Sequence, residues 1–204
     1  MNAMLPLRTD RLVLRDFEER DWRAVHRYAT DYAVVRFMEW GPNTKADTQA
    51  FIARAVAAQA AEPRMTYELA VVGQADGRLI GSCGLRLSGG DARSGSMGYC
   101  LARPFWGRGY ATEAARALLR LGFEDLGLHR VWATCDVENH ASARVLAKAG
   151  LIREGRLREH KWVKGHWRDS HLFALLDREW DRLQTAQIPC PAAAAEETAS
   201  AAAT

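Results

Sequence analysis

Short stretches in which apolar and polar residues alternate predict a series of β-strands in this chain. Successive side chains of a strand point to opposite faces, so a period of two is typical of a half-buried strand. Leu12 and Leu14 alternate in this way near the start of the chain. Turn residues at 74–77 and 164–165 separate two pairs of stretches, and each pair is expected to form a hairpin. The predicted strands span residues 11–17, 67–72, 78–87, 97–101, 130–137, 156–163 and 166–176.

Apolar residues that recur every three or four positions predict the helices. Thr44 followed by Asp47 resembles a capping box, which would open a helix that runs to Gln59. Asn139 is a favoured N-cap residue, and Gly150 is a typical left-handed stop for the helix that begins there. The predicted helices span residues 21–30, 44–59, 110–122, 139–150 and 178–183.

The order of these elements predicts one mixed α/β domain with a largely antiparallel sheet. The strands at 97–101 and 130–137 flank a single helix, so they are expected to pair in parallel through a right-handed crossover. We expect the domain to span residues 1–185. The tail at 186–204 is rich in alanine and has almost nothing large to bury, so it is expected to be disordered.

Length, composition and charge fit an ordinary globular protein. The chain has 204 residues, of which 48% are hydrophobic and 26% are charged. Its net charge of +3 comes from 28 basic and 25 acidic residues, a balance too even to indicate direct nucleic-acid binding, although it suits an anionic ligand. No apolar stretch approaches the ~20 residues of a membrane span, and the N-terminus lacks a signal peptide's apolar stretch. We therefore expect a cytoplasmic protein without a membrane partner.

The four cysteines are widely spaced. Cys83, Cys100, Cys135 and Cys190 form no Cys-x-x-Cys pair, and no run of Cys and His has the spacing of a zinc site. We expect reduced thiols, mostly buried, and no metal.

Small residues gather where the helix after residue 109 is predicted to begin, in the sequence RPFWGRGYATEAARALL at 103–119. A helix start offers backbone N–H groups without a partner and the positive end of the helix dipole. Because Gly107, Gly109 and Ala111 are small, a diphosphate can approach these amides closely, and Arg108 adds positive charge. The loop therefore indicates a pyrophosphate site. The alternative is that small residues only let the helix pack tightly against the sheet.

Two other diphosphate motifs fit this loop less well. A Walker loop requires lysine directly after its second glycine, and neither Gly107 nor Gly109 is followed by lysine. A dinucleotide-binding fingerprint fits in part, because a later strand ends at Asp136, but Thr112 stands where the third glycine belongs. A nucleotide-dependent dehydrogenase therefore stays as an alternative.

The segment FWGRGYATEAARALLRLGFEDLGLHRVWATCDVENHASARVLAKAGLIREG, at 105–155, resembles the coenzyme A binding core of the GNAT superfamily of N-acetyltransferases, and within it the RimJ/RimL-type branch. The family signature, Gln/Arg-x-x-Gly-x-Gly/Ala, aligns its last two positions with Gly109 and Ala111. Trp106 stands at its first position, which removes a polar side chain near the phosphates but no amide. The resemblance extends from about Leu7 to Leu183, nearly the whole domain.

The resemblance implies a fold and an activity. The fold would be a single GNAT-type domain with a mixed, mostly antiparallel sheet of about seven strands and helices on both faces. The activity would move acetyl from acetyl-CoA to a primary amine, without a metal. The branch implies the α-amino terminus of a ribosomal protein as acceptor. The sequence does not determine the oligomeric state, for which a homodimer is one alternative. Small amines, amino acids or antibiotics are alternative acceptors, and a sensor that binds acetyl-CoA without turnover is an alternative function.

The resemblance also implies roles for particular residues. Amides on the strand before the loop would hold the thioester oxygen, because in this family that strand splays from its parallel neighbour. Asn139 would contact the pantetheine arm and Ser142 would protonate the departing thiolate, since Leu146 stands where many members have tyrosine. Asp136 or Glu159 would take the proton of the amine through a water. The implied coenzyme-binding residues are Cys100, Leu101, Ala102, Gly107, Arg108, Gly109, Tyr110, Ala111, Thr112, Asn139 and Ser142.

Overall fold

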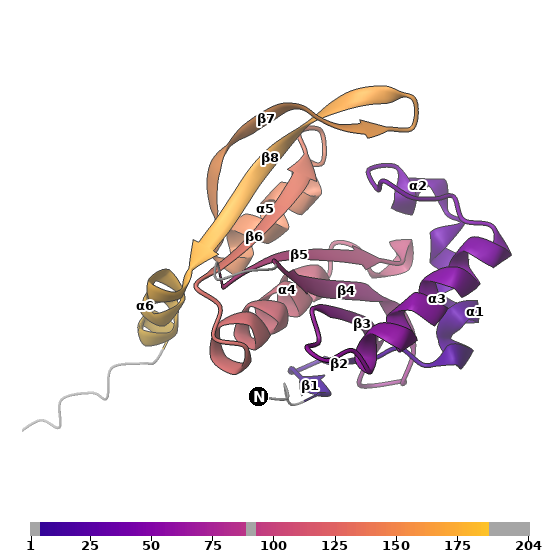
Figure 1. Ribbon diagram of the computed structural model, residues 1–204, viewed down its shortest axis with the longest axis horizontal. Coiled ribbons are helices and arrows are strands. Elements are labelled where there is room, and N and C mark those ends of the chain that lie inside the picture. The colour runs from indigo at the N-terminus through magenta and orange to yellow at the C-terminus, as the bar shows by residue number, and fades with distance from the viewer. Residues whose placement is uncertain (1–4, 89–92, 188–204) are drawn as a thin grey trace, which may run out of the picture.

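A mixed eight-stranded sheet forms the centre of the protein, with strand order β1-β2-β3-β4-β5-β6-β8-β7 (Figure 1). The computed structural model describes residues 5–88 and 93–187. Neighbouring strands are antiparallel except for β5 and β6, which pair in parallel as the helical crossover between them predicts. The strands are β1 Leu7–Arg8, β2 Leu12–Asp16, β3 Thr66–Gly73, β4 Leu79–Leu87, β5 Ser94–Leu101, β6 Arg130–Asp136, β7 Ile152–Val163 and β8 His166–Leu176.

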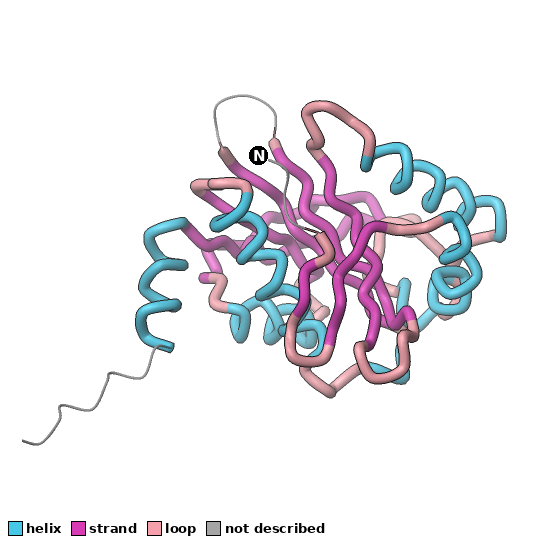
Figure 2. Tube along the Cα trace, turned by 90° about the horizontal axis from the view of Figure 1, so that it is seen from below, coloured by secondary structure: helices cyan, strands magenta, loops and turns pink. Residues whose placement is uncertain are grey.

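Helices cover both faces of the sheet (Figure 2). Val25 of α1 and Ile52 of α3 belong to the apolar cluster on one face, whereas Leu118 of α4 and Leu146 of α5 belong to the cluster on the other. The predicted arrangement of a sheet flanked on both faces is therefore confirmed. The helices are α1 Trp22–Ala29, α2 Tyr32–Val35, α3 Lys45–Gln59, α4 Tyr110–Arg120, α5 His140–Ala149 and α6 Asp177–Gln187, and a π-helical turn, Leu121–Asp125, extends α4.

Central strands are apolar on both sides because both faces are covered. In β3, Leu69 and Val71 join the cluster under α4, and Ala70 and Val72 join the cluster under α1 and α3. This explains why the strand is a nearly continuous apolar run in the sequence.

The helix ends follow the sequence signals. Thr44 Oγ1 accepts a hydrogen bond from Asp47 N, and Asp47 accepts one from Thr44 N, so the capping box that opens α3 is confirmed. Asn139 caps α5, with its Oδ1 accepting from the amide of Ser142 at 3.0 Å. Gly150 ends α5 in the left-handed conformation at φ 111°.

Several boundaries differ from the sequence expectation. The sheet has an eighth strand, β1, because two residues pair with β2 and are too few to produce an alternation. The four-residue α2 was also missed; its N-cap is Asp31, whose side chain accepts from Ala33 N. Strand β5 begins at Ser94 rather than at residue 97, and β7 begins at Ile152 rather than at residue 156. Residues 186 and 187 of the expected disordered tail belong to the end of α6, and the rest of that tail lies outside the described residues.

Within the residues that the structure describes, none of the helices is long and apolar enough to cross a membrane.

Candidate functional site

Strands β5 and β6 separate soon after they begin to pair. Their parallel register holds at three positions, from Ser94 opposite Arg130 to Ser96 opposite Trp132. Beyond these positions β5 continues on β4 and β6 continues on β8. The two strands therefore form a fork in the middle of the sheet (Figure 1). This splay is the one that the family resemblance implied.

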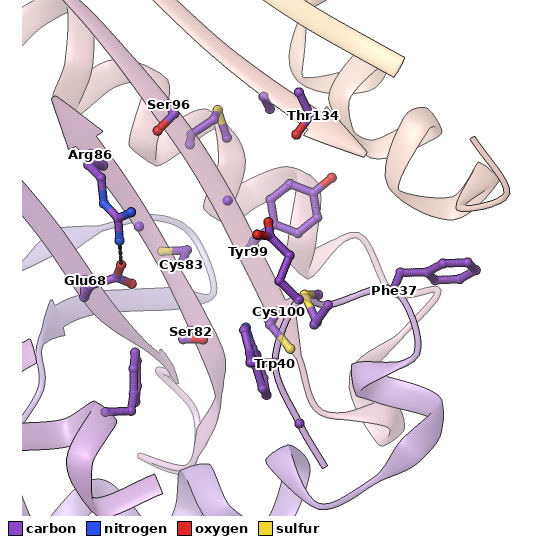
Figure 3. Close-up of a pocket in the computed structure, with 18 of the residues that line it drawn as sticks. Phe37, Trp40, Glu68, Ser82, Cys83, Arg86, Ser96, Tyr99, Cys100 and Thr134 are labelled. Carbon is purple, nitrogen blue, oxygen red and sulfur yellow. Dashed lines mark ion pairs between the residues drawn. The ribbon is translucent and has the colours of Figure 1, made fainter. Parts of the chain in front are cut away.

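The fork opens into a cleft of about 1230 Å³. Met97 and Tyr99 of β5 contact the cluster under α4 and α5, whereas Cys100 contacts the cluster under α1 and α3, and all three line the cleft. The opening therefore passes between the strands and reaches both faces of the sheet. Figure 3 shows Tyr99 and Thr134 on its two sides. The remaining walls come from α1, α3, the segment at 37–43, β3, β4, α5, β7 and β8.

The backbone of β5 has one edge bound to β4 and one edge free to face the fork. Ala102 N donates to Ile80 O at 2.8 Å, so this amide belongs to the β4 ladder. Hydrogen-bonded and outward-facing residues alternate along an antiparallel pair, so the Leu101 amide points away from β4, toward the fork. The Leu101 carbonyl, on the same side, accepts from Trp106 Nε1 at 2.7 Å. Of the three amides that the resemblance implied, Leu101 has the orientation that the role requires.

The loop before α4 has the backbone conformation of an anion site. Gly107 has φ 72°, and Gly109, the N-cap of α4, has φ 82°, a left-handed conformation that side chains disfavour. Gly109 has no side chain with which to cap the helix, so in the described chain the first amides of α4 lack a side-chain acceptor. Such amides bind an anion favourably at the positive end of the helix dipole.

Arg11, directly before β2, contacts both this loop and the first turn of α4. Its guanidinium forms an ion pair with Glu113 in the first turn of α4, at 2.6 Å, and donates to the carbonyl of Arg108 at 3.0 Å. It also lies 4.4 Å from the centre of the Tyr110 ring. Glu113 accepts a further bond from Thr9 Oγ1 at 2.6 Å. The sequence analysis missed Arg11 and Thr9, because the first hundred residues give no signal that they contact α4.

Ser142 and Tyr99 form a hydroxyl pair beside the fork. Tyr99 Oη lies 2.9 Å from Ser142 Oγ, and it also lies within hydrogen-bond distance of the Ser142 carbonyl oxygen, at 3.1 Å. Burial raises the pKa of the Tyr99 phenol well above its usual value, so the phenol keeps its proton at neutral pH. The structure thus places a second hydroxyl against Ser142, whereas Leu146, at the position where the family resemblance implied a tyrosine in other members, is buried.

The thiols near the cleft are not nucleophiles. Burial raises the pKa of Cys100 to about 12, and burial together with the nearby Asp136 raises that of Cys135 to about 11. A cysteine reacts as its thiolate, so these side chains are inert at neutral pH. These raised pKa values favour transfer of a group directly from donor to acceptor over transfer through an acetylated cysteine.

The two carboxylates expected to act as bases lie in different environments. Asp136 lines the cleft, and its oxygens accept from Arg168 Nη1 at 3.0 Å and from the amide of Glu138 at 2.8 Å. Glu159 is exposed on an irregular part of β7, with φ 46°, and its amide donates to Asp169 at 2.8 Å.

The structure brings some of the expected residues together at the cleft and leaves others around it. Cys100, Asp136, Asn139 and Ser142 are among the lining residues. The loop residues Gly107–Thr112 follow the end of β5 and lie outside the lining, as do Leu101, Ala102 and Glu159, all of which the structure describes.

Glu68 also lines the cleft, and the sequence analysis did not select it. It is the one charged residue within the apolar strand β3, and this interruption is the signal that could have identified it. No group of three His, Cys, Asp or Glu side chains gathers at metal-binding distance in the described ranges 5–88 and 93–187.

Comparison with known proteins agrees with this geometry. The family model described as acetyltransferase (GNAT) domain matches residues 11–152. The uncharacterized N-acetyltransferase YnaD of Bacillus subtilis (strain 168) is 33% identical over 173 residues, which cover 85% of this chain and 98% of YnaD. The crystal structure of a GNAT-family acetyltransferase from Bacillus anthracis has a TM-score of 0.76 at 31% identity, and the match covers 84% of this chain and 98% of that one.

A more distant relative has a named acceptor. The [ribosomal protein uS5]-alanine N-acetyltransferase of Escherichia coli (strain K12) is 31% identical over 84 residues, or 41% of this chain and 43% of that enzyme. The match to the family model runs from β2 to the start of β7 and so contains the fork, the glycine loop and α5. The chain therefore belongs to the GNAT family of acetyl-CoA-dependent N-acetyltransferases.

Proposed function

We propose that this enzyme acetylates the α-amino group of a protein N-terminus, with the donor bound through the fork between β5 and β6. The fork is the observation that carries the assignment of the donor site, because it turns the Leu101 amide toward a gap that passes through the sheet. The pantetheine arm of acetyl-CoA runs through this gap. Its diphosphate binds the amides of Gly107–Thr112 at the start of α4, with Arg108 beside it.

Asn139 binds the pantetheine arm through its side-chain NH₂ group. Its Oδ1 already accepts the amide hydrogen of Ser142, so the two N–H groups are the part of the side chain left to donate. Cys100, Leu101 and Ala102 place the acetyl group at the head of the fork. The Leu101 amide donates to the thioester oxygen, and this hydrogen bond strengthens as negative charge develops there.

The reaction forms one C–N bond and breaks one C–S bond. The lone pair of the neutral amine attacks the carbonyl carbon, and the negative charge collects on the oxygen held by Leu101. When the C–S bond breaks, its electron pair leaves on sulfur, and Ser142 donates a proton to the thiolate. Tyr99 lies 2.9 Å from Ser142 Oγ, so it restores that proton and regains its own from the open cleft, which it lines. Asp136 and Glu159 are the sequence-derived choices for the base that removes the proton of the amine.

Two observations support a peptide acceptor. The cleft, at about 1230 Å³, exceeds the ~300–1,000 Å³ of ordinary small-molecule pockets, so it has room for several residues beside the donor arm. In addition, the relative from Escherichia coli bears the name of an enzyme that acts on an alanine of ribosomal protein uS5. A ribosomal protein is therefore the acceptor that we test first.

The test measures thiol release from acetyl-CoA with a panel of amines. The panel contains peptides that begin with alanine, serine or methionine, together with spermidine, lysine and an aminoglycoside. We expect the highest kcat/KM for a peptide. The variant Ser142→Ala should lower kcat about 100-fold or more and leave the affinity for acetyl-CoA unchanged. Ser88→Ala, at an exposed serine just after β4, is the matched control and should leave kcat unchanged.

Two other outcomes would reject parts of the proposal. A small amine as the best acceptor would reject the protein N-terminus and keep the donor site. If acetyl-CoA binds tightly but no amine on the panel is acetylated, the non-catalytic sensor explains the fold better than the enzyme does.

A further inference from the structure

We propose that Glu68 of β3 is the general base that takes a proton from the acceptor ammonium. This inference rests on the proposed transfer to an amine and adds a residue that acts in it. Glu68 lines the cleft on the face of the sheet that α1 and α3 cover. It stands two strands away from β5, where the thioester binds.

The register of the sheet leads from Glu68 to the fork. Glu68 lies opposite Gly84 of β4, and Gly84 lies opposite Gly98 of β5. Residues in register on neighbouring strands point to the same face, so the three form a row across the sheet. Glu68 is the only member of this row with a side chain, and nothing in the row separates it from β5.

The glutamate side chain occupies the space over its glycine neighbour. A Cβ atom added to Gly84 would lie 2.8 Å from Glu68 Oε2, so the carboxylate extends across β4. A Cβ atom added to Gly98 would meet nothing within 4 Å, so the space above β5 is open. Adjacent strands lie about 4.8 Å apart, a distance that one water or the acceptor nitrogen spans. The carboxylate therefore faces open space beside β5 at Gly98, three residues before Leu101, and we place the incoming amine in this space.

The surroundings leave the carboxylate able to accept a proton. Its side chain is 29% exposed, and its ion pair with Arg86 is long, at 3.8 Å, which exceeds the length of a hydrogen bond (Figure 3). Burial raises the pKa of the Glu68 carboxyl, and the Arg86 guanidinium lowers it in part. A base with a raised pKa is better matched to neutral pH than an ordinary glutamate is.

Neutral and charged groups both surround Glu68, and Asp47 of α3 is among the charged groups that line the cleft. Burial raises the pKa values of Tyr28 on α1, Cys83 on β4 and Cys100 on β5, so these groups carry no charge at neutral pH. Arg54 of α3 also lines the cleft. The far wall carries two ion pairs, Glu39–Lys161 and Asp136–Arg168.

Asp136 and Glu159 are less suited to this step. Asp136 accepts a charge-assisted bond from Arg168 at 3.0 Å on one oxygen and an amide bond at 2.8 Å on the other, so both of its oxygens already have partners. Glu159 is exposed on β7, away from the cleft lining.

The proton balance is simple. The acceptor enters as an ammonium ion, and the Glu68 carboxylate takes one of its protons to give a neutral amine and a carboxylic acid. The neutral amine attacks the thioester. Its nitrogen then loses a second proton while the departing sulfur gains one, so these two changes cancel. Glu68 then releases its proton to the open cleft. Glutamate is therefore regenerated in each cycle without a further reactant.

The experiment compares pH–rate profiles with acetyl-CoA and the best amine of the panel. In the wild type, kcat/KM should fall below the pKa of Glu68, which lies above that of a free glutamate, and stay level up to the pKa of the amine. Glu68→Gln should lower kcat/KM at pH 7 about 100-fold or more. Its rate should then rise about tenfold per pH unit up to the pKa of the amine, because only amine that is already neutral can react.

Two further measurements distinguish a base from a structural residue. Hydroxylamine is neutral at pH 7, so Glu68→Gln should react with it at nearly the wild-type rate. Arg86→Gln removes the positive charge that favours the ionised carboxylate, so the acid limb of its profile should move to higher pH. Glu138→Gln, at an exposed glutamate outside the cleft lining, is the matched control and should keep the wild-type profile.

The outcomes separate this inference from the proposed function. If the wild type acetylates an amine and Glu68→Gln keeps its rate and profile, Glu68 is not the base and the transfer itself stands. Loss of the acid limb in Asp136→Asn or Glu159→Gln instead would assign the role to that residue. If the wild type acetylates no amine, the proposed function is rejected and the role of Glu68 is rejected with it. A Glu68→Gln protein that no longer binds acetyl-CoA would also overturn the inference, because it would show a structural role.

Discussion

Gly109 provides the most direct test of the donor site. Its φ of 82° lies in the left-handed region, and a Cβ atom there would lie 3.3 Å from Arg11 Nη2. Valine at this position costs about 1–2 kcal/mol of backbone strain. Its branched side chain also meets a guanidinium that Glu113 and the Arg108 carbonyl hold in place. Gly109→Val therefore has to move the loop, and the first amides of α4 move with it.

The expected loss of affinity follows from the charged hydrogen bonds at this helix start. One hydrogen bond to a charged group contributes about 1.5–3 kcal/mol, so losing one phosphate contact should weaken acetyl-CoA binding about 10- to 150-fold. Gly127 offers a matched control, because it has φ 61° and a Cβ atom there would meet nothing within 4 Å. Gly127→Val carries similar backbone strain in the connection from α4 to β6, away from the loop.

Isothermal titration with coenzyme A, together with thermal unfolding, measures both effects. Both variants should lose stability, and only Gly109→Val should lose affinity. If Gly109→Val binds coenzyme A within twofold of the wild type, the diphosphate does not bind at this helix start. If Gly127→Val loses as much affinity as Gly109→Val, the loss comes from reduced stability and not from the loop.

Three further variants test the structure at other points. Tyr99→Phe removes the hydroxyl beside Ser142 and should lower kcat about three- to tenfold, the equivalent of one neutral hydrogen bond of about 1 kcal/mol, with KM for acetyl-CoA unchanged; an unaltered kcat would remove Tyr99 from the proton path. Asn139→Ala removes the N-cap of α5 and should lower the free energy of unfolding in urea by about 1 kcal/mol, whereas Asn139→Asp, which retains the cap, should lose little. Leu118→Ala at a fully buried site of α4 should cost about 2–5 kcal/mol, and a smaller loss would mean that the cluster under α4 can close the gap.

The sequence was sufficient for the features that local chemistry determines. The capping box at Thr44, the cap at Asn139 and the glycine stop at Gly150 depend on residues within a few positions of each other, and all three are confirmed. The parallel crossover between β5 and β6 was predictable because one helix between two strands allows few arrangements. The two-residue β1 was not predictable, because so short a strand exists only through its partner β2.

The residues that sequence reasoning missed act across long separations. Glu68 belongs to the site only because Gly84 and Gly98 lie in register beside it, and register is a property of the assembled sheet. Tyr99 meets Ser142 across the fork, and Arg11 meets Glu113 from more than a hundred positions away. No periodicity within a single segment can report such contacts.

The hydrogen bonds between the N-terminal segment and α4 affect how this domain can be divided into two fragments. Thr9 and Arg11 together donate to Glu113 from a side-chain hydroxyl, a backbone amide and a guanidinium, so the two halves of the polypeptide jointly support the glycine loop before α4. A fragment that starts at β5 retains every glycine of that loop but loses the groups that brace it. Such a fragment should regain affinity for the coenzyme only by complementation with the preceding half, which makes a break between β4 and β5 a suitable site for a split reporter.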